Sequence, residues 1–411
     1  MSEHKKQPFL LNNEFAWYVT ARLIFLAGLR MTPVLLGWKL YEVTGSKLSL
    51  GVLGLSEVIP AILLALPAGV KIDRSNKQRL ISICMLLYLF IMLGMLLVTS
   101  DYFISSTSAT VVQWSIYALV AATGAVRAFS SPAFSAFLSQ LVFPTQLVRA
   151  TSINSMAWLL AAVIGPGAAG LLMGYTNVTV AFTVVSSLVL IAVFCMQNVK
   201  QKPVLLKPGN TRTWESVKEG IHFILTQKAL LGSMTLDMFA VLFGGVTALL
   251  PVFAKDILHV GPEGLGWLTA ATYLGNFIAI AALTWKPMKN KQGQKLFYVV
   301  GGFGLCILVF ALSQNFWLSF AALFVSGLFD GVSVIIRGTV LQLFVPDEMR
   351  GRVSSVSSIF INSSNELGQF ESGTAASLLG TVPSVIFGGC MTLLVVTITW
   401  FKAPSLRKLE Y

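Results

Sequence analysis

Eight ionisable side chains interrupt long apolar stretches of this 411-residue sequence, and their types are suited to moving protons. They are Arg30, Glu57, Arg127, Asp237, Asp330, Arg337, Glu366 and Glu371. A charged group at membrane depth is costly unless it is paired or reached by water. A carboxyl there can bind a proton when it is buried and release it when water or a cation approaches. We therefore expect these groups to line a central cavity or to pair across it.

The acids and bases divide into two expected roles. The proton-carrying candidates are Glu57, Asp237, Asp330, Glu366 and Glu371, and their candidate charge partners are Arg30, Arg127 and Arg337. Three alternatives stay open. Asp330 and Arg337, two turns apart on one helix, could form a strained structural pair. Asp237 could contact the loops 69–79 or 346–352, and Glu371 could be a structural acceptor for a hydroxyl on a neighbouring helix.

Aromatic rings and amides on other apolar stretches could supply a binding surface. The candidates are Trp158, Asn154, Asn276, Phe277, Phe360, Asn362 and Asn365. A pocket that mixes rings, amides and both signs of charge suits a bulky amphiphilic molecule better than a small sugar.

The composition shows which elements must position these groups. Hydrophobic residues make up 55% of the chain, charged residues 11%, and the mean hydropathy is +0.77. One water-soluble core cannot hide this much apolar surface, so most of it must face lipid. The chain has room for roughly twelve transmembrane helices. We place them near 15–43, 48–71, 80–100, 111–143, 149–174, 178–197, 229–256, 264–286, 294–314, 316–344, 353–380 and 382–402.

Basic residues fall on one side of this arrangement. The loops near 69–79, 198–228 and 286–295 are rich in Lys and Arg, whereas Lys47 and Lys255 fall on the other side. The positive-inside rule then predicts that both termini are cytoplasmic. The net charge of +12 is spread over loops beside apolar spans, so we expect contact with the lipid bilayer and no nucleic acid.

The chain is predicted to contain two similar halves. The division is an N-terminal six-helix bundle (1–197), a cytoplasmic linker with an amphipathic helix (198–228), a C-terminal six-helix bundle (229–402) and a tail (403–411). SQLVFPTQLVRATS (139–152) and LQLFVPDEMRGRVS (341–354) match in register at the end of the fourth span of each half. Two such bundles around a central cavity are typical of rocking transporters.

Several motifs resemble the major facilitator superfamily, and within it the twelve-span bacterial exporters of enterobactin and macrolides. The segment GVKIDRSNKQR is similar to the superfamily signature G-x3-D-R-x-G-R-K, with Asn76 in place of a glycine. The Gly-Pro run at 165–170, the segment 237–266 and PDEMRGR at 346–352 are similar to segments of that exporter group. The resemblance covers nearly the whole chain and implies an all-α membrane protein of two pseudo-symmetric six-helix bundles.

The motifs also carry expected roles. A cytoplasmic gate is assigned to Gly69, Asp73, Arg74, Lys77, Arg79, Arg350 and Arg352. Gly69 would let two helices approach closely, and Asp73 would hold the inner ends of the bundles through charge-assisted contacts that break during the cycle. A turn in span 5 is assigned to Gly165, Pro166 and Gly170, with close helix packing as the plainer interpretation.

No pattern typical of an enzyme appears. HExxH, GxSxG and Walker-type motifs are missing, and the four cysteines form neither a CxxC motif nor a Cys/His group. We expect no enzymatic activity, cofactor or metal. The sequence favours a monomeric inner-membrane exporter that exchanges a siderophore-like or drug-like amphiphile for protons. A lipid or lysolipid flippase on the same fold, or a sensor that transports nothing, remains the alternative.

Overall fold

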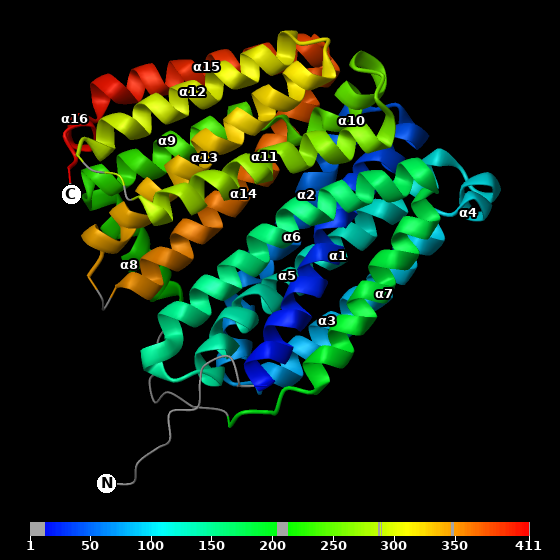
Figure 1. Ribbon diagram of the computed structural model, residues 1–411, viewed down its shortest axis with the longest axis horizontal. Coiled ribbons are helices and arrows are strands. Elements are labelled where there is room, and N and C mark those ends of the chain that lie inside the picture. Colours follow the sequence, from blue (N-terminus) through cyan, green and yellow to red (C-terminus); the bar gives the residue numbers. More distant parts are fainter. Residues whose placement is uncertain (1–12, 204–212, 287, 289, 347–348, 411) are drawn as a thin grey trace.

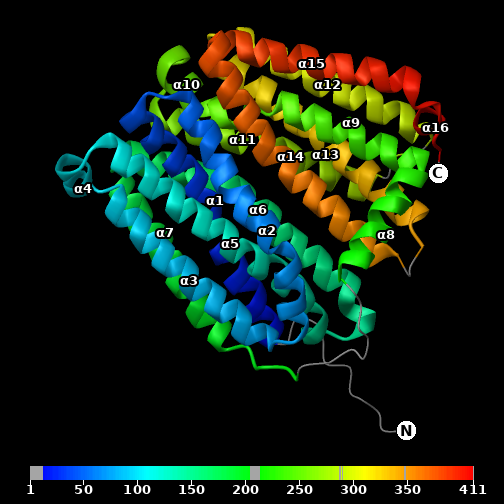
Figure 2. The same ribbon diagram turned by 180° about the vertical axis from the view of Figure 1, so that it is seen from behind.

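The protein is an assembly of long helices in the computed structural model (Figures 1 and 2). The structure describes residues 13–203, 213–286, 288, 290–346 and 349–410, and within these ranges it contains helices and no strand. Helices suit such apolar stretches because lipid offers no partners for unpaired backbone groups.

Two bundles make up the fold. The first consists of α1 (Asn13–Thr44), α2 (Lys47–Asp73), α3 (Lys77–Val98), α4 (Asp101–Ser106), α5 (Ala109–Leu141), α6 (Leu147–Tyr175) and α7 (Val178–Gln197). The second consists of α9 (Lys228–Gly244), α10 (Leu250–Val252), α11 (Gly261–Trp285), α12 (Gln292–Leu312), α13 (Phe316–Phe344), α14 (Arg350–Leu379), α15 (Thr381–Lys402) and α16 (Pro404–Arg407). In the chain, α8 (Thr213–Thr226) lies between the two bundles.

Several helices begin at a polar residue whose side chain accepts a hydrogen bond from the first turn. These N-caps are Ser46, Asn76, Ser108, Asn177 and Asn315. Each satisfies a backbone N–H that would otherwise lack a partner at the helix end. The short loops therefore contain the polar residues that set where the spans begin.

Eleven helical segments in the described ranges are long and apolar enough to cross a membrane. The twelfth expected span, 353–380, forms α14, whose 30 residues would extend about 45 Å. It is rich in serine and less apolar than the others, and Ser357, Ser364 and Ser372 are buried. The sequence therefore predicted this helix correctly, although several of the residues that it buries are polar.

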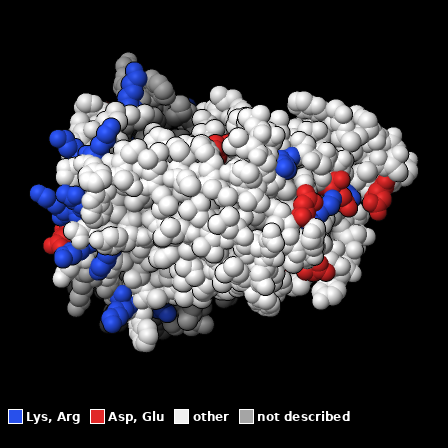
Figure 3. All heavy atoms as spheres, turned by 90° about the horizontal axis from the view of Figure 1, so that it is seen from above, with Lys and Arg blue, Asp and Glu red and all other residues white. Residues whose placement is uncertain are grey.

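Charged residues concentrate at the two ends of the molecule. Figure 3 shows Lys and Arg gathered at one end, Asp and Glu predominating toward the other, and few charges on the wide surface between them. We call the end where α2 finishes and α3 begins the basic end, and the end where α1 finishes and α2 begins the opposite end. The surface between them, with few charges, has the character expected of a lipid-facing belt.

Both bundles use the same packing scheme. In the first, the contacting pairs include α1–α6, α1–α7, α2–α5, α3–α5 and α3–α7. In the second, the equivalent pairs are α9–α14, α9–α15, α11–α13, α12–α13 and α12–α15. The matching segments 139–152 and 341–354 both lead into the following helix at equivalent places, from α5 to α6 and from α13 to α14. The duplication seen in the sequence is thus repeated in the packing.

Two equivalent interfaces, α2–α14 and α6–α11, join the bundles. A Cβ atom added at Gly170 would lie 2.6 Å from the Cα of Gly266, and one added at Gly373 would lie 2.7 Å from the Cα of Gly51. Only glycine fits such backbone contacts, which are typical of membrane helices. In Figures 1 and 2 the bundles lie together near α10 and diverge toward α8.

Two expectations about local structure, the span 5 turn and the close approach at Gly69, were wrong. The turn does not form, because α6 runs without a break through Pro166 and uses Gly165 and Gly170 for close packing. The span expected near 229–256 is present as Lys228–Ile257, and within it α9 ends at Gly244 and is followed by a 3-10 turn, α10 and a π-helical segment, Phe253–Ile257. The expected close approach at Gly69 is absent, since a Cβ there would meet nothing within 4 Å.

The linker helix α8 packs against α9, α14 and α2. Ile224 is buried in the core of the second bundle, whereas Ile221 and Leu225 are exposed. The described part of α8 therefore has a buried and an exposed side. The side chains of Trp214 and Val217 on the same helix lie outside the described residues.

Candidate functional site

Arg127 on α5 joins carboxylates from both bundles. Its Nη1 lies 2.8 Å from Oε1 of Glu57 on α2, and its Nη2 donates to Oε1 of Glu366 on α14 at 2.9 Å. The Glu366 side chain is only 9% exposed, and its Oε2 has no hydrogen-bond partner in the described structure. Two carboxylates around one guanidinium leave a formal charge of −1. We call these three residues the Arg127 centre.

Glycines bring the helices of the Arg127 centre together. A Cβ on Gly124, one turn before Arg127, would lie 2.0 Å from the backbone oxygen of Glu57. A Cβ on Gly54 would lie 3.0 Å from the backbone oxygen of Glu366. Because neither position has room for a side chain, α5, α2 and α14 approach closely enough for one arginine to reach both acids.

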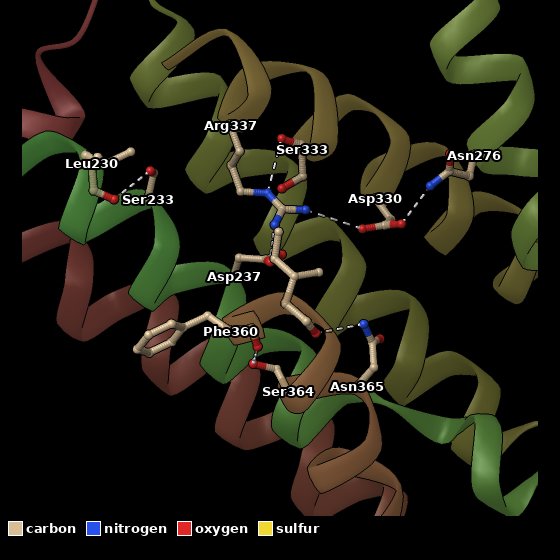
Figure 4. A network of polar contacts seen from close by, with 11 residues as sticks. Leu230, Ser233, Asp237, Asn276, Asp330, Ser333, Arg337, Phe360, Ser364 and Asn365 are labelled. Atoms are coloured by element: carbon tan, nitrogen blue, oxygen red, sulfur yellow. Dashed lines mark hydrogen bonds and ion pairs between the residues drawn. The ribbon is translucent and has the colours of Figure 1, made fainter. Parts of the chain in front are cut away.

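Arg337 on α13 forms a second centre, which lies entirely within the second bundle. Its guanidinium pairs with Asp237 on α9, and its Nη2 lies 3.9 Å from Oδ1 of Asp330 on its own helix. Asn276 on α11 donates to Oδ2 of Asp330 at 2.7 Å. Figure 4 shows Arg337 pointing toward both acids, with Asn276 beyond Asp330. We call these four residues the Arg337 centre.

The Arg337 centre borders a small cavity of about 20 Å³ between α9, α12 and α13. Asp237, Asp330 and Ser333 line it together with apolar residues, and the buried Oγ of Ser333 has no partner among the described atoms. Sequence reasoning did not single out Ser333, although its spacing from Asp330 and Arg337, three and four residues, puts all three on one helix face. The direct Asp330–Arg337 pairing expected to be strained is indeed long, and Asp237 supplies the close partner.

Arg30 on α1 has aromatic neighbours in place of an acid. Its guanidinium carbon lies 4.8 Å from the ring centroid of Trp158 on α6 and 5.7 Å from that of Tyr273 on α11. No ion pair or hydrogen bond joins Arg30 to another residue in the described ranges. A Cβ on Gly165 would lie 2.6 Å from Cβ of Arg30, so α6 packs directly on this arginine.

The other binding candidates differ in their burial and in their hydrogen-bond partners. Asn154 is buried and its Oδ1 has no partner among described residues, whereas Phe277 is half-buried. Phe360 and Asn365 are exposed on α14, where Asn365 donates to the backbone oxygen of Ile361 at 3.0 Å. The side chain of Asn362 lies outside the described residues.

Glu371 belongs to neither arginine centre. It is half-buried on α14, and its described polar contact is with the hydroxyl of Ser372, 3.5 Å away on the same helix. Ser372 also donates to the backbone oxygen of Gly245 at 3.0 Å. The neighbouring hydroxyl expected for Glu371 is thus on its own helix.

Among the expected gate residues whose side chains the structure describes, no ion pair joins one to another. Asp73 is exposed, and its side chain makes no hydrogen bond or ion pair with any residue that the structure describes. Arg352 pairs with Glu219 of α8, and the side chain of Arg350 lies outside the described residues. Arg74 and Arg79 are exposed and Lys77 is half-buried. The two groups of bases therefore lie on separate bundles without a connecting ion pair in the described structure.

Asn76, which replaces a glycine of the superfamily signature, organises this loop. Its Oδ1 accepts from the backbone N–H of Arg79 at 3.1 Å and so caps α3. Its Nδ2 donates to the backbone oxygen of Lys202 at 3.0 Å. The departure from the signature therefore fixes the start of α3 and the chain after α7.

A polar contact that sequence reasoning missed joins the bundles at the opposite end. The hydroxyl of Tyr41 on α1 donates to a carboxylate oxygen of Asp256, and Nζ of Lys255 lies 5.6 Å from the Tyr41 ring centroid. A Cβ on Gly37 would lie 3.1 Å from Pro251. The bundles are therefore in contact at the opposite end.

Two bundles, each with six long helical spans, and ionisable groups at membrane depth define a multi-span membrane transporter. The chain belongs to the transmembrane secretion effector family of the major facilitator superfamily, whose sequence profile matches residues 7–410. The resemblance stated from the motifs is confirmed at the level of family and fold.

Known relatives are distant but cover much of the chain. The enterobactin exporter EntS of Shigella flexneri is 24% identical over 295 residues, which cover 71% of this chain and 70% of EntS. The MFS-type transporter YfiS of Bacillus subtilis (strain 168) is 21% identical over 371 residues, 87% of this chain and 85% of YfiS. Both lie below the identity at which a substrate can be carried over.

Solved structures share the fold. A mutant of the nucleoside transporter NupG superposes with a TM-score of 0.78 at 11% identity, over 94% of this chain and 99% of NupG. A bacterial homologue of the iron transporter ferroportin in an inward-facing state gives a TM-score of 0.73 at 15% identity, over 98% of this chain and 100% of that one.

Proposed function

We propose that this transporter is a secondary exporter that moves an amphiphilic small molecule out of the cytoplasm in exchange for protons. The observation that supports it most is the Arg127 centre, in which one arginine holds a glutamate of its own bundle and a glutamate of the other. Relatives named as exporters, among them EntS, favour the outward direction. A siderophore-like or drug-like amphiphile is the proposed cargo.

The proposed mechanism uses relative movement of the bundles. α5 and α14 belong to different bundles, so rocking of one against the other must break the bond from Arg127 to Glu366. The bond from Arg127 to Glu57 lies within the first bundle and can persist. Protonation of Glu366 would remove its charge and weaken the bond across the bundles, which couples a proton to the conformational change.

The proposal includes an orientation. Because Lys and Arg gather at the basic end, this end would face the cytoplasm, with both termini on that side and the protein in a bacterial inner membrane. The structure would then be closed toward the periplasm through α2–α14, α6–α11 and Tyr41. In the described structure no ion pair joins the bases near Asp73 to those near Arg352. The gate would therefore be open toward the cytoplasm.

Everted membrane vesicles test the function. Respiration makes the lumen acidic, and an exporter should then accumulate enterobactin, the first probe, inside the vesicles. Accumulation should require the pH gradient and stop with nigericin, because protons leaving the lumen drive uptake. Addition of the probe should in turn release luminal protons, measured with a pH-sensitive dye.

A panel separates the proposal from its alternatives. Erythromycin and a lysophospholipid are tested beside enterobactin, with vesicles that lack the protein as the control. Uptake of the lysophospholipid alone would indicate a flippase, and no flux of any probe would support a non-transporting sensor. Flux that ignores the imposed pH gradient would contradict proton antiport.

A further inference from the structure

We infer that Arg30, Trp158 and Tyr273 form a recognition site for the anionic group of an aromatic or otherwise flat amphiphile. This inference rests on the proposed function, since it specifies the charge of the molecule that is moved. The site draws on α1 and α6 of the first bundle and α11 of the second, so its ligand would touch both moving bodies.

The charge balance of the three arginines leads to this assignment. Arg127 and Arg337 each lie beside two carboxylates, whereas Arg30 has none within the part of the chain that the structure describes. A cation at membrane depth needs a counter-charge or water. Aromatic faces compensate it only in part, because cation–π attraction is weaker than a desolvated ion pair. Arg30 is thus the centre that a bound anion would complete.

The surroundings of Arg30 fix its direction. α6 packs against the base of its side chain at Gly165, which limits the rotamers that are open to it. The Trp158 and Tyr273 rings lie near its guanidinium, at 4.8 and 5.7 Å. A planar guanidinium presents N–H donors at its edge while its faces contact rings, which suits a carboxylate, sulfonate or phenolate oxygen.

A second polar group lies next to this site. Asn154 is one turn before Trp158 on the same face of α6. It is 9% exposed, and its Oδ1 has no hydrogen-bond partner in the described structure. An unpaired buried amide oxygen is unusual, and a hydroxyl or N–H of a ligand would satisfy it. The site therefore offers one cation, two rings and one acceptor.

Two ions of the same shape and opposite charge test the site. Tetraphenylborate and tetraphenylphosphonium are the probes, and binding is measured by equilibrium dialysis against protein in nanodiscs, with empty nanodiscs as the blank. We expect saturable binding of tetraphenylborate that weakens by about tenfold or more in Arg30→Gln. Binding of tetraphenylphosphonium should not weaken. Trp158→Leu, which keeps the charge, should weaken tetraphenylborate binding by a smaller factor.

Lys39→Gln is the matched control, because it removes one positive charge from the same helix, away from the site. Lys39 pairs with Glu42 at 2.9 Å near the end of α1. The Lys39→Gln variant should bind tetraphenylborate as well as the wild type does. The inference is overturned if wild-type protein binds no tetraphenylborate above the blank, or if Arg30→Gln and Trp158→Leu both bind it as the wild type does.

The result is separable from the proposed function. Size-exclusion profiles show first that each variant is folded. If the binding test fails while everted vesicles still accumulate a probe, the anion site is wrong and the exporter assignment stands. If no probe is transported while tetraphenylborate binding depends on Arg30, the site stands and the transport assignment is wrong.

Discussion

The two bundles place an arginine on equivalent helices, Arg127 on α5 and Arg337 on α13, and each arginine faces two carboxylates. Arg127 takes one of its acids from the other bundle, whereas Arg337 takes both from its own. An arginine with two carboxylates therefore lies once at the interface between the bundles and once inside a single bundle. Relative movement of the bundles would change the Arg127 centre, whereas the Arg337 centre can stabilise the bundle that contains it.

The largest effect is expected at the Arg337 centre. Arg337→Met leaves Asp237 and Asp330 beside an apolar cavity without their cation. Removing one partner of a buried ion pair costs about 3–5 kcal/mol, and we expect the free energy of unfolding to fall by this amount. Denaturant titration in detergent micelles measures it. Lys39→Met should cost no more than about 1 kcal/mol, because its partner Glu42 is exposed. Equal stability of both variants would show that the Arg337 centre does not stabilise its bundle.

At the Arg127 centre we expect a change of conformation more than of stability. Glu366→Gln removes the charge that links the bundles, which should shift the balance between open and closed forms by about 5- to 150-fold. Spin labels at the exposed positions Tyr102 and Trp317, at the opposite end, should report longer distances.

Glu57→Gln is the matched control for this shift. It removes a carboxylate charge that pairs with the same arginine, but Glu57 and Arg127 both belong to the first bundle. Its distance distribution should resemble that of the wild type. If both variants shift alike, the location of the acid in one bundle or the other does not matter and the comparison fails.

Close glycine contacts between the bundles give a steric test of the same comparison. A Cβ added by Gly170→Ala would meet the backbone of Gly266, so we expect about 1–3 kcal/mol of destabilisation of the closed opposite end. Gly167→Ala, three residues earlier on α6, meets nothing within 4 Å and should be neutral. Denaturant titration and the same label pair measure both. Equal behaviour of the two variants would remove the packing argument.

The smallest effect is expected at Tyr41. Tyr41→Phe removes one hydrogen bond to Asp256, worth about 1 kcal/mol, so the closed form should lose roughly fivefold in population. Tyr298→Phe is the control, because Tyr298 is exposed and its hydroxyl has no hydrogen bond to a described residue. The label pair at the opposite end measures both variants. A distribution that Tyr41→Phe leaves unchanged would show that this bond does not help to close the bundles.

Sequence reasoning predicted the helices and the duplication well, because length, hydropathy and capping residues are local properties. The polar helix α14 was also found, since Phe and Leu residues still mark its span. The break after Gly244 was missed, because a glycine pair inside an apolar run is compatible with a continuous helix. The turn at Pro166 was wrong for the opposite reason, since neighbouring helices allow a proline in an unbroken span.

The candidate site could be predicted only as a list of residues. Eight ionisable groups were recognised from their apolar surroundings, yet which acid faces which arginine depends on helix rotation and on contacts between the bundles. Glu366 illustrates this limit, because its partner Arg127 is 239 residues away in the chain. The gate residues illustrate another, since their contacts depend on which conformation is observed.

The most direct test of the account asks whether Glu366 couples transport to protons. Purified wild-type protein and Glu366→Gln are reconstituted in liposomes, and enterobactin is followed with and without an imposed pH gradient. We predict that the variant still exchanges labelled for unlabelled probe but no longer accumulates it when the gradient is applied. Gradient-driven accumulation at the wild-type level by Glu366→Gln would contradict the account.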